Sequence, residues 1–308
     1  MSGSQVTDLV TKDKAKTFMK EILNIDVITV KEPCKQNLDY LNQIIAAFIN
    51  KIPFQNFNFL CQPPENHTLP TIQEAVSNVL SGAGGLCWTN NSAFFLILRA
   101  LGFSVHLVIA SVATRGTNDH TIVVARDVVK ARDNYLVEVG FGGPTFKAID
   151  LDFEEESDTV SLSFNTFKYV KRGEEYIRMH KMSRAIERFP HSEGDWNLVY
   201  FFKLEPLAVQ QAAEMMQKAY ESQEFFFRNH LRATIFKNNI ATALKTEGDQ
   251  KAIILQENAE KHLRPIKDYD VMTQREDLLK ELADIFPMVP RPNIALAIDN
   301  YVKVINCS

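Results

Sequence analysis

One cysteine stands where its thiol could act as a nucleophile. Cys87 follows the run Gly84-Gly85-Leu86 and opens a predicted helix. A thiol in the first turn of a helix lies at the positive end of the helix dipole and near free N–H groups, which favours the thiolate that attacks carbonyl carbons. The two glycines would let a carbonyl substrate come close to the sulfur. Alone, Cys87 could equally be a packed core residue, because free cysteines are among the most buried residue types.

A histidine and a glutamate on two consecutive predicted strands give this cysteine possible partners. His120 begins a strand after the turn-like segment 115–119, and Glu138 interrupts the apolar run 135–139. An unpaired carboxylate in such an apolar setting is costly, and an imidazole is a suitable partner for it. Carboxylate, imidazole and thiol together fix the tautomer of the ring and support a thiolate and imidazolium pair. The alternative is that His120 lies on the strand surface and Glu138 faces solvent.

The other histidines and cysteines offer weaker sites. No further histidine has a cysteine or an unusual carboxylate near it; these are His67, His106, His180, His191, His230 and His262. The cysteines besides Cys87 are widely spaced and form no C-x-x-C pair; they are Cys34, Cys61 and Cys307. We therefore expect free thiols in a reducing compartment and no metal site.

The composition is that of an ordinary soluble globular protein. The chain has 308 residues, 45% of them hydrophobic and 23% charged, which is enough for two or three domains with substantial cores. The net charge is −4, and the basic residues are scattered rather than gathered as a nucleic-acid phosphate backbone would require. No segment resembles a secretory leader or a membrane span. We expect a cytoplasmic protein without a nucleic-acid or membrane partner.

Helices dominate the first third of the chain. Asn37 is predicted to cap a helix that stops near Pro53, because apolar residues recur between them every three or four positions. Thr71 and Glu74 form a capping box that opens a second helix. A third helix is predicted from Cys87 to Gly102.

The rest of the chain favours strands and then a mixture of strands and helices. The predicted strands of the middle third are 104–112, 120–127, 135–141, 159–169, 174–181 and 196–204. The last third is predicted to contain helices 207–221 and 273–285 and strands 231–238 and 251–257. We predict an α+β fold with an N-terminal helical domain (1–103), a central antiparallel β-barrel domain (104–206) and a C-terminal α/β lid domain (207–308).

Several motifs spread over most of the chain belong together. They are Ile52-Pro53-Phe54-Gln55-Asn56-Phe57-Asn58, Gly84-Gly85-Leu86-Cys87 with Asn91, Gly102-Phe103, His120, Glu138-Val139-Gly140-Phe141-Gly142 and Tyr200-Phe201-Phe202-Lys203-Leu204-Glu205-Pro206. Together they resemble the arylamine N-acetyltransferase family. The resemblance implies a catalytic core like that of cysteine proteases and transglutaminases.

The resemblance also implies roles for individual residues. Cys87 would take the acetyl group of acetyl-CoA, His120 would activate it, and Glu138 would orient His120. Phe54 and Phe141 would line the pocket of an arylamine, arylhydroxylamine or hydrazine acceptor, although either could simply pack in the core. CoA would lie between the barrel and the C-terminal region, at contacts that no phosphate-binding motif identifies. We expect a monomer that works by a ping-pong mechanism and needs no metal.

Three positions depart from the family pattern. The triad acid is usually aspartate, and Glu138 carries one more methylene. An arginine usually precedes the two glycines, where this chain has Ala83, and an acid usually follows Pro-Phe, where it has Gln55. Because those two residues normally form a charged pair, losing both avoids an unpaired buried charge but could loosen the loop that holds Cys87.

Two other functions stay open at this point. A thiol hydrolase or transglutaminase-like enzyme shares the order cysteine, histidine, acid. A catalytically degenerate homologue that binds CoA or an aromatic ligand without turnover would explain the departures at Glu138, Ala83 and Gln55.

Overall fold

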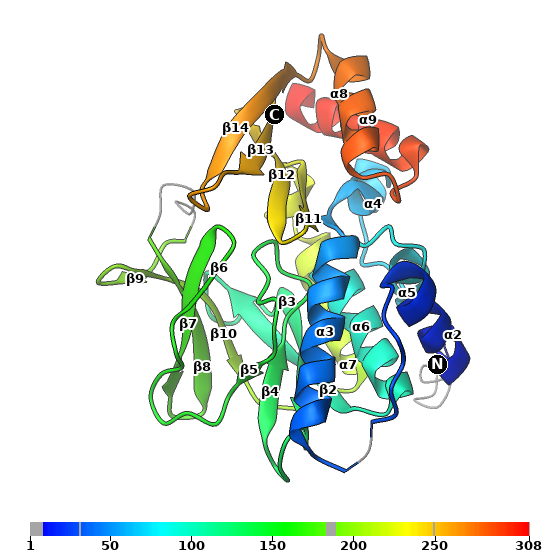
Figure 1. Ribbon diagram of the computed structural model, residues 1–308. Coiled ribbons are helices and arrows are strands. Elements are labelled where there is room, and N and C mark those ends of the chain that lie inside the picture. Colours follow the sequence, from blue (N-terminus) through cyan, green and yellow to red (C-terminus); the bar gives the residue numbers. More distant parts are fainter. Residues whose placement is uncertain (1–8, 31, 183–188, 249, 308) are drawn as a thin grey trace.

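The N-terminal part of the protein is a group of helices. The computed structural model describes residues 9–30, 32–182, 189–248 and 250–307. Helices of the first third are α2 (Lys12–Thr17, continued by a π-helical turn, Phe18–Ile22), α3 (Lys35–Lys51), α4 (Phe57–Leu60), α5 (Ile72–Leu80) and α6 (Cys87–Leu101). Helix α6 lies in the middle of this group, next to α3 and α5 (Figure 1).

The ends of these helices follow the predictions closely, with one exception. The capping box of Thr71 and Glu74 is present at the start of α5, and α6 ends at Gly102 in the left-handed conformation with φ 102°. Helix α3, however, starts at Lys35 after the N-cap Cys34. The prediction that Asn37 caps it is wrong, because the Asn37 amide donates instead to the carbonyl of Glu32 and reaches toward the loop before β4.

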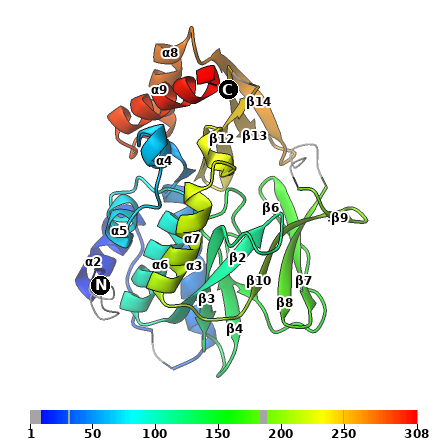
Figure 2. The ribbon, with the colours of Figure 1, turned by 180° about the vertical axis from the view of Figure 1, so that it is seen from behind.

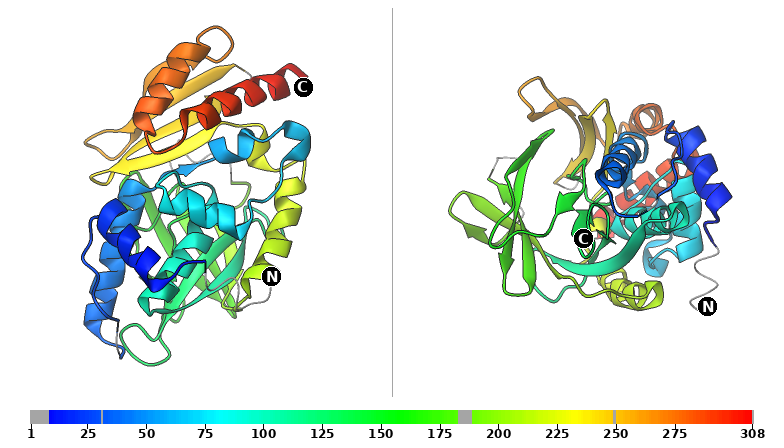
Figure 3. Two further views of the ribbon diagram at one scale, coloured as in Figure 1. Left: turned by 90° about the vertical axis from the view of Figure 1, so that its right-hand side faces the viewer. Right: turned by 60° about the horizontal axis from the view of Figure 1, so that its bottom comes forward.

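A large antiparallel sheet forms the middle of the chain. Its strand order is β5-β4-β3-β2-β10-β8-β7-β6, with β9 paired to β10. The strands are β2 (Ser104–Val112), β3 (His120–Arg126), β4 (Asn134–Val137), β5 (Ile149–Asp150), β6 (Val160–Leu162), β7 (Asn165–Arg172), β8 (Glu175–Lys181), β9 (Ser192–Glu193) and β10 (Trp196–Lys203). Within the described residues no ladder joins β5 to β6, so the curled sheet is a half-barrel (Figures 1 and 3).

Two predicted strands have different bounds in the structure. The predicted strand 135–141 ends at Val137, so Glu138 lies just beyond β4 rather than within a strand. The predicted strand 159–169 is divided into β6 and β7, because Ser163 takes a positive φ of 54° in the turn between them. Both differences come from local backbone turns that the apolar pattern does not show.

The last third adds a second sheet and two helices. The sheet order is β1-β11-β12-β13-β14, and the elements are β1 (Phe54–Gln55), α7 (Val209–Glu221), a 3-10 turn (Phe226–Arg228), β11 (Arg232–Lys237), β12 (Ile240–Glu247), β13 (Lys251–Glu257), β14 (Leu263–Asp270), α8 (Arg275–Ile285) and α9 (Arg291–Cys307). Strands β12 and β14 and helix α9 were not predicted. The division of the chain into three domains stays a prediction.

Helix α6 is the central element, on which neighbouring helices and strands pack. Thirteen of its residues are buried, because it packs against α5 on one side and against β2 and β3 on another. Helix α7 runs beside it on the back of the molecule (Figure 2). The C-terminal sheet with α8 and α9 lies at one end of this assembly (Figures 1 and 3). No helix among the described residues is long and apolar enough to span a bilayer.

The loop before α6 is held by polar contacts to the segment after Pro53. Gln55 is fully buried, and its Nε2 donates to the carbonyls of Ala83 and Gly84, both at 3.2 Å. The Asn58 amide donates to the Gly84 carbonyl at 3.3 Å. The neutral Gln55 therefore ties down the loop where the family pattern has a charged pair.

Gly84 has no room for a side chain. Its φ is +64°, and a Cβ built on it would lie 2.2 Å from the carbonyl oxygen of Pro53. We expect Gly84→Ala to lower the free energy of unfolding by about 3 kcal/mol or more, because strain adds to a clash with backbone. Gly173→Ala is the matched control, since Gly173 has φ +61° with nothing within 4 Å. It should cost only about 1 kcal/mol. Equal losses for the two variants in chemical denaturation would contradict this account.

Candidate active site

Helix α6 presents Cys87 at its first turn. The residue before it, Leu86, is extended with φ −77° and ψ −177°, and no side chain caps the helix. The first N–H groups of α6 are thus not taken by a side-chain cap. The thiol donates weakly to the carbonyl oxygen of Asp119 at 3.7 Å. Cys87 is 6% exposed, so the sulfur lies at the edge of the core.

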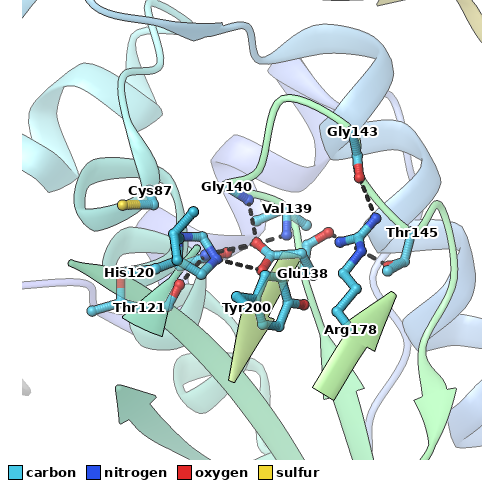
Figure 4. A network of polar contacts seen from close by, with 12 residues as sticks. Cys87, His120, Thr121, Glu138, Val139, Gly140, Gly143, Thr145, Arg178 and Tyr200 are labelled. Carbon is cyan, nitrogen blue, oxygen red and sulfur yellow. Dashed lines mark hydrogen bonds and ion pairs between the residues drawn. The ribbon is translucent and has the colours of Figure 1, made fainter. Parts of the chain in front are cut away.

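His120 follows Asp119 directly and is bound to Glu138. Its Nε2 lies 2.7 Å from Oε2 of Glu138, and both side chains are buried (Figure 4). Burial acts to lower the pKa of His120, but the negative charges of Glu138 and Cys87 outweigh it and raise the pKa to about 10. The imidazole therefore favours its charged form beside the sulfur.

The structure brings Cys87, His120 and Glu138 together in one place. The thiol bonds the Asp119 carbonyl, and Figure 4 draws no bond between the sulfur and the His120 ring. Catalytic hydrogen bonds are often long or poorly aligned before substrate binds. Glu138 occupies Nε2 of His120, so Nδ1 is the ring nitrogen that remains for the sulfur.

Asn91 fixes the carboxylate from the helix side. One turn after Cys87, its Nδ2 donates to Oε1 of Glu138 at 2.9 Å, and its Oδ1 accepts the N–H of Val139 at 3.1 Å. The N–H of Gly140 donates to the same Oε1 at 3.0 Å. With His120 on Oε2, both oxygens of the longer acid are occupied. Glu138 therefore reaches His120 in good geometry in spite of its extra methylene.

The two predicted pocket phenylalanines lie near the triad. The Phe141 ring stands edge-on to His120 with centroids 5.5 Å apart. Phe54 lies against Gly142, since a Cβ built on that glycine would meet its ring at 3.5 Å. Both side chains are half-buried. Their role as contacts of an aromatic acceptor stays a prediction.

Residues that the sequence did not suggest also surround the site. Tyr220 on α7 is buried, and its hydroxyl makes no hydrogen bond within the described residues. Burial and then the charge of Cys87 raise the pKa of Tyr220 well above its usual value. The Tyr200 ring lies 5.3 Å from that of His120. On β8, the fully buried Arg178 lies near Glu138 (Figure 4). Tyr200 belongs to a motif that carries the family resemblance, whereas nothing in the local sequence marks Tyr220 or Arg178.

Comparison with known proteins assigns the chain to a family. A family model described as N-acetyltransferase matches residues 37–283, which is most of the chain. The chain belongs to this family. The predicted resemblance to the arylamine N-acetyltransferases is thus confirmed, and the family is one of acyltransferase enzymes.

The curated relatives are distant and match only part of the chain. Arylamine N-acetyltransferase 1 of Felis catus is 24% identical over 185 residues, which cover 57% of this chain and 71% of that protein. The arylamine N-acetyltransferase of Mycolicibacterium smegmatis is 26% identical over 181 residues, which cover 56% of this chain and 60% of the relative. The match thus spans less than two thirds of the mycobacterial protein.

Solved structures share the fold over nearly the whole chain. The arylamine N-acetyltransferase of Mycobacterium marinum has a TM-score of 0.70 at 17% identity, covering 92% of this chain and 98% of that one. The enzyme of Salmonella typhimurium has a TM-score of 0.70 at 18% identity, covering 94% and 99%. The predicted α+β fold class is confirmed. A structure of the Mycobacterium marinum protein in complex with CoA is among the similar ones.

The raised pKa of His120 predicts a pH-dependent contribution to stability. The group's folded pKa of about 10 lies above its ordinary 6.5, so the stabilisation is full below about pH 6.5 and is lost as pH rises toward 10. The unfolding free energy of wild type relative to His120→Gln should therefore fall by a few kcal/mol between pH 6.5 and 10.

His106→Gln is the matched control. His106 is partly buried, and burial followed by the charge of Arg126 lowers its pKa to about 4, so it stays neutral over this range. Its difference from wild type should not change between pH 6.5 and 10. Chemical denaturation at several pH values checks both, and a pH-independent difference for His120→Gln would count against the ion pair with Glu138.

Proposed function

We propose that the protein is an acyl-CoA-dependent N-acetyltransferase that uses Cys87 as a covalent carrier and acetylates arylamines, arylhydroxylamines or hydrazines by a ping-pong mechanism. The observation that carries the proposal is the buried contact of Glu138 with His120 beside a sulfur at a helix start. Membership of the N-acetyltransferase family supports the same reaction. The proposed donor is acetyl-CoA, and no step needs a metal.

The first half-reaction forms a thioester on the enzyme. The Cys87 sulfur attacks the carbonyl carbon of the acyl-CoA, a new C–S bond forms, and the carbonyl π electrons move to oxygen. Collapse of this intermediate breaks the bond to the CoA sulfur. The His120 imidazolium supplies the proton that the leaving CoA thiolate takes up.

The second half-reaction transfers the acyl group to the amine. The amine nitrogen attacks the acyl-Cys87 carbonyl, and neutral His120 removes the proton that the nitrogen must lose. When the intermediate collapses, the C–S bond breaks, the amide leaves and the Cys87 thiolate is restored beside the imidazolium. Glu138 stays ionised throughout, because its role is to hold the ring and stabilise its positive charge.

The half-buried rings of Phe54 and Phe141 support an aromatic acceptor. Each ring presents an apolar surface near the triad, and stacked or edge-on aromatic pairs add to the binding free energy beyond burial. Phe141 already contacts His120 edge-on. An aromatic amine between these rings would have its nitrogen close to the acyl carbon.

A groove next to the triad is the proposed site for the CoA portion. Its lining includes Ser111, Arg115, Asn118, Lys203 and, from α7, Met215. Asn118 lies two residues before His120, so the groove reaches the loop that contacts the Cys87 sulfur. The two basic side chains are exposed and could contact phosphate groups, and Arg115 also lies 4.0 Å over the Phe201 ring.

Intact-mass analysis tests the covalent step. Incubation with acetyl-CoA should add one acetyl group to the wild-type chain, and an aromatic amine should remove it. Cys87→Ser should show no adduct, because the alcohol is far harder to ionise than the thiol. Cys61→Ser is the matched control, since Cys61 is a half-buried thiol away from the triad, and it should be acetylated like wild type.

The outcomes separate the competing functions. An adduct that persists in Cys87→Ser refutes the proposal. Loss of the adduct to water at the same rate with and without amine identifies a thiol hydrolase instead. Absence of any adduct over a panel of acyl-CoA thioesters identifies a homologue that binds without turnover.

Replacing Arg115 tests the groove. Arg115→Ala should raise the KM for acetyl-CoA roughly fivefold with little change in kcat, because an exposed charged contact is worth about 1 kcal/mol and is not made to the reacting atoms. Arg172→Ala is the matched control, since Arg172 is also exposed and pairs with a glutamate, Glu193, but does not line the groove. Steady-state kinetics check both variants, and an equal rise in KM would place CoA elsewhere.

A further inference from the structure

A buried arginine lies beside the triad, and none of the steps above uses it. Arg178 on β8 is 0% exposed. Its Nε donates to Nε2 of His180 at 2.9 Å, and its Nη2 donates to the carbonyl oxygen of Gly143. Its Nη1 makes no hydrogen bond within the described residues. Because a guanidinium loses much of its hydration when buried, it needs compensation from its surroundings.

Aromatic rings supply part of that compensation. The guanidinium carbon lies 4.5 Å from the ring centroid of Phe167 and 4.9 Å from that of Phe141. Two tyrosine rings, whose hydroxyls are 3.0 Å apart, complete the surroundings; they are Tyr169 and Tyr200. Ring faces attract a cation but carry no net charge. In the described chain no carboxylate lies within ion-pair distance of Arg178, so its countercharge must act from slightly farther away.

Glu138 is that countercharge. Burial opposes the charge of Arg178, but the nearby Tyr169, Tyr200 and Glu138 favour it, and the net effect raises its pKa above the usual value. Figure 4 shows Glu138 between His120 on one side and Arg178 on the other. The carboxylate thus lies between two cations, of which only the imidazolium is hydrogen-bonded to it.

The other titratable groups around the triad carry no positive charge near neutral pH. Burial and then Arg178 lower the pKa of His180 well below its usual value, so its ring is neutral and accepts the hydrogen bond. Burial is the main cause that raises the pKa of Tyr169 to about 12 and the pKa values of Tyr200 and Tyr220 well above their usual value. Asp119 contacts Cys87 through its backbone carbonyl, while its carboxylate accepts hydrogen bonds from the Val112 N–H and the Thr117 hydroxyl.

We propose that Arg178 is a positioning residue for the triad, which keeps Glu138 ionised by its permanent charge and fixes the 139–143 loop through the Gly143 carbonyl. The inference rests on the proposed function, in which ionised Glu138 holds His120 as an imidazolium. An arginine stays charged at every pH at which the protein is folded, so it biases Glu138 constantly. Without it, the carboxylate would lose one of its two positive neighbours and would hold the imidazolium less firmly.

The pH dependence of Cys87 alkylation tests this role. The rate of reaction of Cys87 with iodoacetamide, followed by peptide mass mapping from pH 5 to 9, reports how much thiolate is present. In Arg178→Met, the pH of half-maximal rate should rise by about one unit or more, which makes labelling roughly tenfold slower below it. Arg178→Lys keeps the charge and should stay near wild type.

Three further variants test whether the effect is merely structural. Phe167→Leu loses packing on the guanidinium but no charge, so its half-maximal pH should match wild type. If Arg178→Met does not fold, Arg178→Gln carries the same expectation, because its amide can still donate to Gly143 while the charge is gone. In a Glu138→Gln background, neutralising Arg178 should cause no further shift.

These outcomes decide whether Arg178 positions the triad or has no effect on it. An unchanged half-maximal pH in a folded neutral variant overturns the inference, as does an equal shift with and without the Glu138 carboxylate. A shift in Arg178→Lys as large as in Arg178→Met would also overturn it. Wild-type Cys87 that reacts no faster than the exposed Cys34 would instead count against the proposed function itself.

Discussion

The buried contact between Glu138 and His120 is the interaction on which the site depends. Neither group is stable there alone, because a charge removed from water costs several kcal/mol unless it is paired and hydrogen-bonded. The fold meets this requirement from three directions at once. The carboxylate receives the imidazole N–H from β3, the Asn91 amide from α6 and the Gly140 N–H from its own loop. The helix that supplies Cys87 therefore also holds the acid, so the position of the nucleophile and the charge of the imidazole are set by one element.

The departures from the family pattern at Gln55 and Ala83 follow the same rule, which is that buried polar groups need hydrogen-bond partners. Gln55 replaces a charge with an amide, and that amide donates to two carbonyls of the loop before Cys87 while its oxygen accepts the Asn58 N–H. Ala83 opposite it is buried and needs no partner. Neutral hydrogen bonds thus stand where the family pattern has a charged pair. The loop remains fixed because every polar atom of the Gln55 side chain makes a hydrogen bond.

Local patterns in the sequence were enough to predict that Cys87 starts a helix and that His120 starts a strand. Capping residues and apolar periodicity depend only on residues close together in the chain. The contact of His120 with Glu138 depends on register. Strand β3 pairs with β4 at Val123 and Val137, and continuing this register places Glu138 on the same face as His120, two residues away. No residue in the sequence predicts that register between β3 and β4. Strand β14 was missed because it is polar and exposed, and Arg178 because an arginine on an alternating strand usually faces water.

Burial of the nucleophile bears on which reaction the site favours. Cys87 is 6% exposed, and the buried Tyr220 on α7, whose pKa the charge of Cys87 helps to raise, packs with its ring 5.4 Å from that of Phe59 and 4.6 Å from that of Phe225. In a ping-pong cycle the acyl-enzyme must wait for its second substrate, and water is the competitor at far higher concentration. Buried surroundings disfavour a small polar nucleophile, while an aromatic amine can gain binding free energy from rings near the triad such as Phe141. In the proposed reaction, the buried surroundings of the thiol therefore favour transfer over hydrolysis, and the same burial requires Glu138 and His120 to be paired with each other.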